Sequence, residues 1–434
     1  MLSATLARVP ALPSPSEQEE MIACHACGLV HRLPPMTHRT IATCTACGTP
    51  ICRRIERSIE KTLALYLGAL LLFVVANAFP FMTMSLEGNA TATTILDGAR
   101  ALYREGMWPV ALVVLLTGTV MPLLKITGML YVLLPLQLGV RPKGLSAAFR
   151  WIDKLHPWSM MEVYLLGVIV AYVKLSDLAT IHLGYALYAF VAAIILMAAG
   201  DAALEAHAVW RRLAPQAGPE VLHHRPGTEL VSCHECDQLV RVPAHAHDLA
   251  CPRCTAPLHK RKVDSITRTW ALVLTAAILY LPANLYPVMT VVSFGHGEPD
   301  TILSGIMTLL AVGMWPVALL VFFASITVPV LKLLGLAWLL ITVQRGSTWR
   351  PRDRTLIYRI IEGVGRWSMV DVFMIAILTA LVSLGNIATI VPGPGAIAFC
   401  AVVIVTMLAS MSFDPRLIWD AIDERSDHGR ALRA

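Results

Sequence analysis

Long runs without a charged residue dominate the hydrophobic pattern of this chain. The four longest cover residues 62–86, 269–295, 301–331 and 372–413, the last divided by a Pro-Gly-Pro-Gly break at 392–395. A membrane-spanning helix needs roughly 20 apolar residues. The pattern therefore predicts eight spans, at about 62–82, 107–136, 160–181, 185–207, 269–290, 314–342, 368–390 and 396–413.

Helix-breaking residues interrupt the second span of each half. Gly118, Pro122 and Gly128 lie in one, and Pro329 and Gly335 lie in the other. Because proline removes a helical hydrogen bond, these spans are predicted to be kinked or tilted. Segment 94–105 has apolar residues spaced to form a short helix on a membrane surface.

The basic residues are distributed unevenly among the loops. Arg and Lys precede the first and fifth spans, fill the loops after the second and sixth, and follow the fourth. By contrast, residues 291–313 contain no Lys or Arg, and residues 85–106 contain only Arg100 and Arg104. The positive-inside rule places both termini in the cytoplasm.

Composition supports a membrane protein and limits its other roles. Charged residues make up 15% of the chain, against about 25% in soluble proteins. The net charge of +6 follows from the basic loops and is no argument for nucleic-acid binding. Residues 1–20 lack the apolar core of a signal peptide and are expected to form a disordered tail.

The chain is a tandem duplication. The block Gly-Met-Trp-Pro-Val-Ala-Leu at 106–112 recurs 207 positions later at 313–319, and Lys125 recurs as Lys332. Later in each half the shift is 209 positions, which relates the Trp-Ser-Met block at 158–160 to that at 367–369 and Glu162 to Asp371. A unit of about two hundred residues is too long for a solenoid and fits the parallel repeats of membrane proteins.

Each half begins with four cysteines in two Cys-x2-Cys pairs. The quartets are Cys24, Cys27, Cys44 and Cys47, and Cys233, Cys236, Cys251 and Cys254. This spacing is typical of zinc ribbons, in which two knuckles supply four thiolates in a tetrahedron. Two structural zinc ions are therefore expected; another metal such as iron, and thiol redox chemistry, are the alternatives. His25 and His234 lie inside knuckles that already have four ligands, so we expect them to be spectators.

These blocks together resemble the paraquat-inducible protein A family. The resemblance rests on the two ribbons, the Asn-x-x-Pro-x-Met end of the first span, the Gly-Met-Trp-Pro-Val block, the Trp-Ser-Met block with its acid, and the Ser-Phe-Asp-Pro-Arg ending, and it covers residues 20–425. It implies an inner-membrane subunit of a phospholipid transport system in a bacterial envelope. Its implied partner is a periplasmic protein built of MCE domains. No enzymatic activity is expected.

The predicted fold is an α-helical polytopic membrane protein, with a small zinc ribbon and four transmembrane helices in each half. The expected units are a tail at 1–20, ribbons at 21–55 and 226–262, membrane modules at 56–212 and 263–420, and a tail at 421–434. The loop charges place both ribbons in the cytoplasm.

Ionisable residues inside the predicted spans are the candidates for function. A charge at mid-bilayer costs about 2.5–3.5 kcal/mol even on insertion scales. The candidates are Lys174, Asp177, Lys332, Asp371 and Thr406, with Lys125 and Glu162 as a secondary pair. Lys174 and Asp177 are three residues apart and share a helical face. These groups either relay protons during transport or only fix helix packing through ion pairs.

Three classes of function remain open on the sequence. The first is a lipid-transport subunit. The second is a membrane redox or stress sensor that uses the cysteines, and the third is a passive anchor for a periplasmic partner. The chain has no Gly-x4-Gly-Lys-Ser/Thr loop, so an ion gradient or another subunit would have to supply any energy.

Overall fold

The computed structural model describes residues 20–33, 40–86, 89–140, 142, 144–175, 180–213, 227–243, 249–293, 296–382 and 388–422. Eight helical stretches within these ranges are long and apolar enough to span a membrane, which confirms the predicted number. They are Ser58–Ala78, Trp108–Gln137, Leu145–Leu175, Tyr185–Ala203, Ser265–Leu285, Trp315–Gln344, Pro351–Leu381 and Pro394–Ser412.

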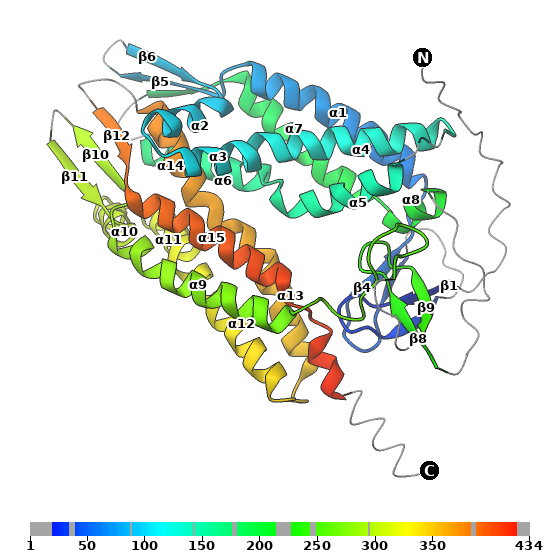
Figure 1. Cartoon of the computed structure of the whole chain (residues 1–434). Coiled ribbons are helices and arrows are strands. Elements are labelled where there is room, and N and C mark those ends of the chain that lie inside the picture. The colour runs from blue at the N-terminus through cyan, green and yellow to red at the C-terminus, as the bar shows by residue number, and fades with distance from the viewer. Residues whose placement is uncertain are drawn as a thin grey trace.

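The two halves form similar helical modules that lie side by side (Figure 1). The first contains α1 (Ser58–Ala78), α3 (Trp108–Leu115), α4 (Met121–Gln137), α5 (Leu145–Leu155), α6 (Met161–Leu175) and α7 (Tyr185–Ala203). The second contains α9 (Ser265–Leu285), α11 (Trp315–Phe322), α12 (Val328–Gln344), α13 (Pro351–Val364), α14 (Val370–Leu381) and α15 (Pro394–Ser412). In each module the first helix packs along the last, α1 on α7 and α9 on α15.

The modules meet through α14, the most deeply buried span. It packs against α6 and against α2 (Ile95–Arg104), the short helix expected at 94–105. Gly167 on α6 makes this close approach possible, because a Cβ there would lie 2.9 Å from Cβ of Phe373. The equivalent short helix of the second half is α10 (Ile302–Ala311).

The duplication holds element by element. From α1 to α12 the bounds of matching helices differ by 207 positions, and α7 and α15 differ by 209, as the sequence blocks indicate. The repeat also preserves details: Ser58 Oγ donates to the carbonyl of Ala203, and Ser265 Oγ donates to that of Ser412. Residues related by these shifts can therefore be compared directly.

The predicted irregularity of the second span appears as a π-helical turn in each half. The turns cover Leu116–Val120 and Phe323–Thr327, and α4 and α12 begin immediately after them, with Pro122 and Pro329 in their first turns. Such turns inside α-helices are often associated with functional sites. The second one contains Ser325, which belongs to the candidate site.

Two features differ from the predicted pattern. The charged segments before the third and seventh spans are helices, α5 and α13, because each has an apolar face, formed in α5 by Leu145, Phe149 and Ile152. The ends predicted for the first, third, fifth and seventh spans belong instead to strands. They form the three-stranded sheets β6-β5-β7 and β11-β10-β12, in which every pair is antiparallel.

These sheets lie at the opposite end of the helices from the cysteine modules (Figure 1). Their strands are β5 (Met82–Leu86), β6 (Asn89–Thr93), β7 (Thr180–Leu183), β10 (Met289–Ser293), β11 (His296–Asp300) and β12 (Ala388–Pro392). The first cysteine module contains β1 (Glu20–Ala23), β2 (Val30–Leu33), β3 (Ile41–Thr43) and β4 (Pro50–Arg53), and the second contains β8 (Thr228–Ser232) and β9 (Leu239–Pro243). The short helix α8 (Ala206–Leu213) follows α7.

Candidate functional site

The eight predicted cysteine ligands form two compact quartets. Within each quartet all four sulfur atoms lie within 4.8 Å of one another. In the first quartet Sγ of Cys24 and Cys47 are 3.5 Å apart. A zinc tetrahedron with Zn–S bonds of about 2.3 Å has edges of about 3.8 Å, so the donor set fits a four-thiolate metal ion.

Backbone geometry explains the knuckles. The amide of Gly28 donates to the carbonyl of Cys24, and its φ of 82° allows the chain to turn back toward the metal site. In the second module Asp237 takes this place with a φ of 54°. His31, which sequence reasoning did not select, has Nε2 3.2 Å from Sγ of Cys44 and is placed to donate to a metal-bound thiolate.

The cysteine modules dock crosswise on the helical modules. The second one contacts the first half: Arg150 on α5 donates to the carbonyl of Cys254, and Lys154 pairs with Glu235 at 2.8 Å. The first one contacts the second half: Arg352 on α13 donates to the carbonyl of Thr45, and Trp419 packs against the first cysteine cluster.

Arg416 joins the two cysteine modules to each other. Its guanidinium donates to the carbonyl of His25 at 3.3 Å and to Nδ1 of His234 at 2.9 Å. The backbone carbonyl of His25 and the ring of His234 thus bind the arginine that bridges the modules. Sequence reasoning treated both histidines as spectators. Arg416 is 6% exposed, so this contact is buried.

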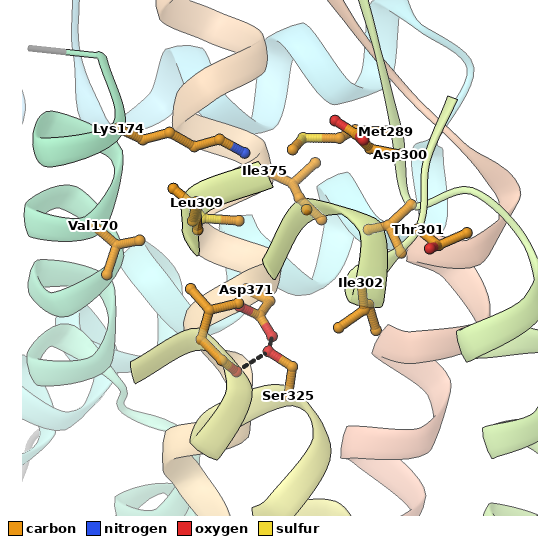
Figure 2. Close-up of a pocket in the computed structure, with 14 residues that line it drawn as sticks. Val170, Lys174, Met289, Asp300, Thr301, Ile302, Leu309, Ser325, Asp371 and Ile375 are labelled. Atoms are coloured by element: carbon orange, nitrogen blue, oxygen red, sulfur yellow. Dashed lines mark hydrogen bonds between the residues drawn. The ribbon is translucent and has the colours of Figure 1, made fainter. Parts of the chain in front are cut away.

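A cavity of about 40 Å³ lies between the modules, near the sheet end of the helices. It is bounded by α6, α10, α11, α14, the second π-helical turn and strands β10 and β11, and it brings Lys174, Asp300 and Asp371 to one space. Figure 2 shows Lys174 extending from α6 and Asp300 entering from the end of β11, with Asp371 and Ser325 farther in. Since one water needs about 10–15 Å³, the cavity has room for a few water molecules.

Asp371 is the most deeply placed acid of this cavity. It is 5% exposed, and its Oδ2 accepts a hydrogen bond from Ser325 Oγ in the π-helical turn. Its Oδ1 is buried without a hydrogen-bond partner among the described residues. A buried carboxylate oxygen that lacks a donor is costly, so this atom is suited to bind a proton or a water from the cavity.

Lys332 hydrogen bonds with a hydroxyl and not with Asp371. It is 2% exposed, and its Nζ donates to Oγ1 of Thr406 at 2.8 Å. Thr406 Oγ1 in turn donates to the carbonyl of Val403. The structure thus places Lys332 and Thr406 together, as the sequence suggested, but it gives Lys332 and Asp371 different partners and no ion pair with each other.

The first half contains a charge cluster that sequence reasoning missed. Lys125 Nζ donates to Oδ2 of Asp201 at 2.6 Å and to Nδ1 of His156 at 2.9 Å. Tyr66 donates its hydroxyl to Oδ1 of the same aspartate. The expected pairing of Lys125 with Glu162 is therefore wrong: Glu162 is exposed, and Asp201, 76 positions from Lys125, supplies the carboxylate.

The remaining predicted residues divide between the described and the undescribed parts of the chain. Lys174 lies at the cavity and is partly buried. Asp177 lies outside the described residues, so the predicted Lys174–Asp177 pair stays a prediction. Asp300 and Ser325 were missed, although Asp300 ends a charge-poor segment and Ser325 is a polar residue in an apolar span.

Comparison with known proteins gives a consistent result across nearly the whole chain. The family model described as Paraquat-inducible protein A matches residues 59–214 and 266–423, once in each half. The chain is 35% identical over 414 residues to the intermembrane transport protein PqiA of Escherichia coli K12, covering 94% of this chain and 97% of the relative.

Two further relatives extend the comparison. The lipophilic envelope-spanning tunnel protein A of Escherichia coli K12 is 32% identical over 405 residues, covering 92% of this chain and 91% of the relative. A probable intermembrane transport protein of Haemophilus influenzae is 27% identical over 411 residues, covering 93% and 97%. No solved structure gives a significant match.

Proposed function

Because the chain belongs to the paraquat-inducible protein A family, we propose that it is the inner-membrane subunit of an intermembrane phospholipid transport system. It would load lipid onto, or unload it from, a periplasmic MCE-domain protein and so maintain the bacterial outer membrane. The names of two relatives, an intermembrane transport protein and an envelope-spanning tunnel protein, support transport between membranes. In this proposal the protein is not an enzyme.

The proposed orientation places both ribbons in the cytoplasm and both sheets in the periplasm. The basic residues of α5 and α13 lie toward the ribbon end, which the positive-inside rule assigns to the cytoplasm. The sheet end would then face the periplasmic partner. The cavity near that end is mostly apolar and has three charged side chains, which suits a site that a lipid headgroup or a proton reaches from the periplasm.

The proposed energy source is proton movement along a relay that lies mainly in the second half and includes two residues of the first. Asp371 with its unpartnered oxygen carries this proposal, because a buried acid beside a water-sized cavity can take up and release a proton. Lys174, Asp177, Lys332 and Thr406 are the other proposed members of the relay. Ser325 and Thr406 suit this role because a hydroxyl can both donate and accept a hydrogen bond.

The two ribbons would each hold one structural zinc. Four thiolates complete a tetrahedral site, so the ion would supply folding energy to the ribbon and would have no open position for substrate. The ribbons' part in transport is then mechanical: they fix the two helical modules to each other at the cytoplasmic end.

Neutralising Asp371 tests the relay. We expect Asp371→Asn, carried by the chromosomal copy of the host, to lower survival under envelope stress at least tenfold. The amide keeps the shape of the carboxylate but cannot take up and release a proton as the acid does. Glu162→Gln, at the matching position of the first half, should behave like the wild type because Glu162 is exposed. Membrane abundance is measured by immunoblot for both variants.

A direct measurement tests the transport assignment separately. The native complex is purified in mild detergent, and its bound proteins and lipids are identified by mass spectrometry. We expect a periplasmic MCE-domain protein and phospholipid. A complex without lipid would contradict the transport assignment, and normal survival of Asp371→Asn would contradict the relay alone.

A further inference from the structure

The two repeated lysines have opposite surroundings. Lys125 and Lys332 occupy the same position in α4 and α12, 207 residues apart, and both are buried. Lys125 is neutralised by Asp201 at 2.6 Å. Lys332 has the hydroxyl of Thr406 as its hydrogen-bond partner, and no carboxylate among the described residues pairs with it.

The repeat shows which residues differ around the two lysines. Asp201 on α7 corresponds to Ser410 on α15, and Tyr66 on α1 corresponds to Val273 on α9. His156 corresponds to Gly365. At these positions the second half therefore has neither the acid nor the two groups that hydrogen bond with the lysine or with its acid.

Contacts in the second half support this correspondence. A Cβ added to Gly365 would lie 3.1 Å from Nζ of Lys332, which is where His156 approaches Lys125. Ser410 is buried, and its hydroxyl donates to the carbonyl of Met407 rather than to a charged group. An aspartate at position 410 would therefore be placed relative to Lys332 as Asp201 is placed relative to Lys125.

Charged neighbours strengthen the contrast between the two lysines. Lys125 lies within electrostatic range of Asp153 as well as Asp201, and His156 lies near Arg366. Lys332 is buried, and it forms no ion pair with a described residue. An unpaired charge inside a membrane protein is costly, and Asp201 removes this cost for Lys125 but no carboxylate among the described residues removes it for Lys332.

We propose that residue 201 and its repeat equivalent, residue 410, determine which of the two repeated lysines belongs to the relay: Asp201 holds Lys125 in an ion pair as a fixed packing element, and Ser410 leaves Lys332 free to exchange its proton. This inference rests on the proposed proton relay. It identifies the residue that decides which lysine takes part in that relay. Ser410 acts through Lys332 and does not itself carry the proton.

Transfer of the acid to the second half tests this proposal. Ser410→Asp gives Lys332 a fixed counter-ion, and we expect survival under envelope stress to fall at least tenfold at normal membrane abundance and metal content. Ser410→Asn, which has the same shape without the charge, should stay within twofold of the wild type. The reciprocal change, Asp201→Ser, should lower abundance instead, because it leaves the buried Lys125 without its carboxylate partner.

Lys332→Met separates this proposal from the relay on which it rests. Wild-type survival of Lys332→Met would overturn the relay and the proposal with it. Loss of function in Lys332→Met combined with wild-type survival of Ser410→Asp would overturn only the role of position 410. Equal defects in Ser410→Asp and Ser410→Asn, or low abundance of Ser410→Asp alone, would show a packing effect and would also overturn it.

Discussion

At the scale of single residues, Asp97 shows how one side chain starts a helix. Its carboxylate accepts hydrogen bonds from the backbone amide of Thr94 at 2.8 Å and from the Thr94 hydroxyl at 2.7 Å, which forms a capping box at the first turn of α2. Burial opposes ionisation, but these bonds and Arg100 outweigh it and lower the pKa of Asp97.

The lowered pKa predicts a pH-dependent stability. A depressed pKa means that Asp97 stabilises the folded protein above its unfolded pKa of about 3.9, and that this contribution is lost as the pH falls through the folded value. We expect Asp97→Ala to reduce the free energy of unfolding by roughly 0.5–2 kcal/mol at pH 7 and by less below pH 4. Thermal unfolding of purified protein at the two pH values measures this. An equal loss at both would contradict the ionic contribution.

The charge cluster around Lys125 shows what a sequence can reveal about single residues. The lysine itself stands out as a charge in an apolar run, so it was selected. Its partner could not be found from helical spacing, because Asp201 comes from another helix and only the packing of α4 on the bundle brings the two together. Asp201 did carry a signal, as a charge within the predicted fourth span.

At the scale of helices, α2 and α10 occupy matching positions and make different contacts. A Cβ at Gly98 on α2 would lie 3.3 Å from the backbone oxygen of Ala376, so this helix is closed against α14. Gly305 is the matching residue of α10, and a Cβ there would meet nothing within 4 Å. The free space beside Gly305 belongs to the cavity that Asp371 faces.

This difference predicts opposite effects for one substitution. Alanine favours a helix over glycine by about 1 kcal/mol, whereas overpacking against an immobile backbone costs about 1–3 kcal/mol. Gly98→Ala should therefore lower the free energy of unfolding, and Gly305→Ala should raise it slightly. Thermal unfolding of the two variants in the same detergent compares them. Equal shifts would show that α2 and α10 are packed alike.

A larger side chain at the same position tests the cavity. We expect Gly305→Leu to fill the space in front of Asp371 and to reduce survival under envelope stress, with the unfolding temperature unchanged or higher. Gly305→Ala serves as the control that leaves the cavity largely open.

Element boundaries were predictable where hydrophobicity decides them and not where local hydrogen bonding does. The long apolar runs located all eight spans. The sequence pattern does not predict the hairpins after the first and fifth spans, because the apolar runs continue into their first strands. The pairing of β7 and β12 with these hairpins depends on chain segments about a hundred residues away. The sequence pattern predicts loops in place of α5 and α13, because the basic residues of these helices obscure their apolar faces.

At the scale of the whole molecule, the two cysteine modules connect the two halves. The second ribbon packs into the main hydrophobic core with the first helical module, and the first ribbon packs on Trp419 after the last span. Arg416 then joins both ribbons. Loss of a metal ion should therefore disturb the contact between modules as well as the ribbon that held it.

We expect close to two zinc ions per chain in the purified protein. Cys24→Ser combined with Cys27→Ser should reduce this to about one and lower membrane abundance, because the binding energy of a structural zinc is folding energy. Cys52→Ser, outside the quartets, should keep both ions. Metal content is measured by plasma mass spectrometry, and two ions in the double variant would contradict the assignment.

The crosswise docking of the ribbons also orders events during synthesis. The second ribbon leaves the ribosome after α5, the helix on which Arg150 receives it, has already been made. The first ribbon is made before either helical module, but the residues on which it docks include Arg352, Arg416 and Trp419, so it can dock only after the last span has been made. A fragment that ends after the first module would lack both the seat of its own ribbon and the ribbon that covers α5. Although each half has the sequence of a complete unit, neither half can finish its fold before the other has been translated.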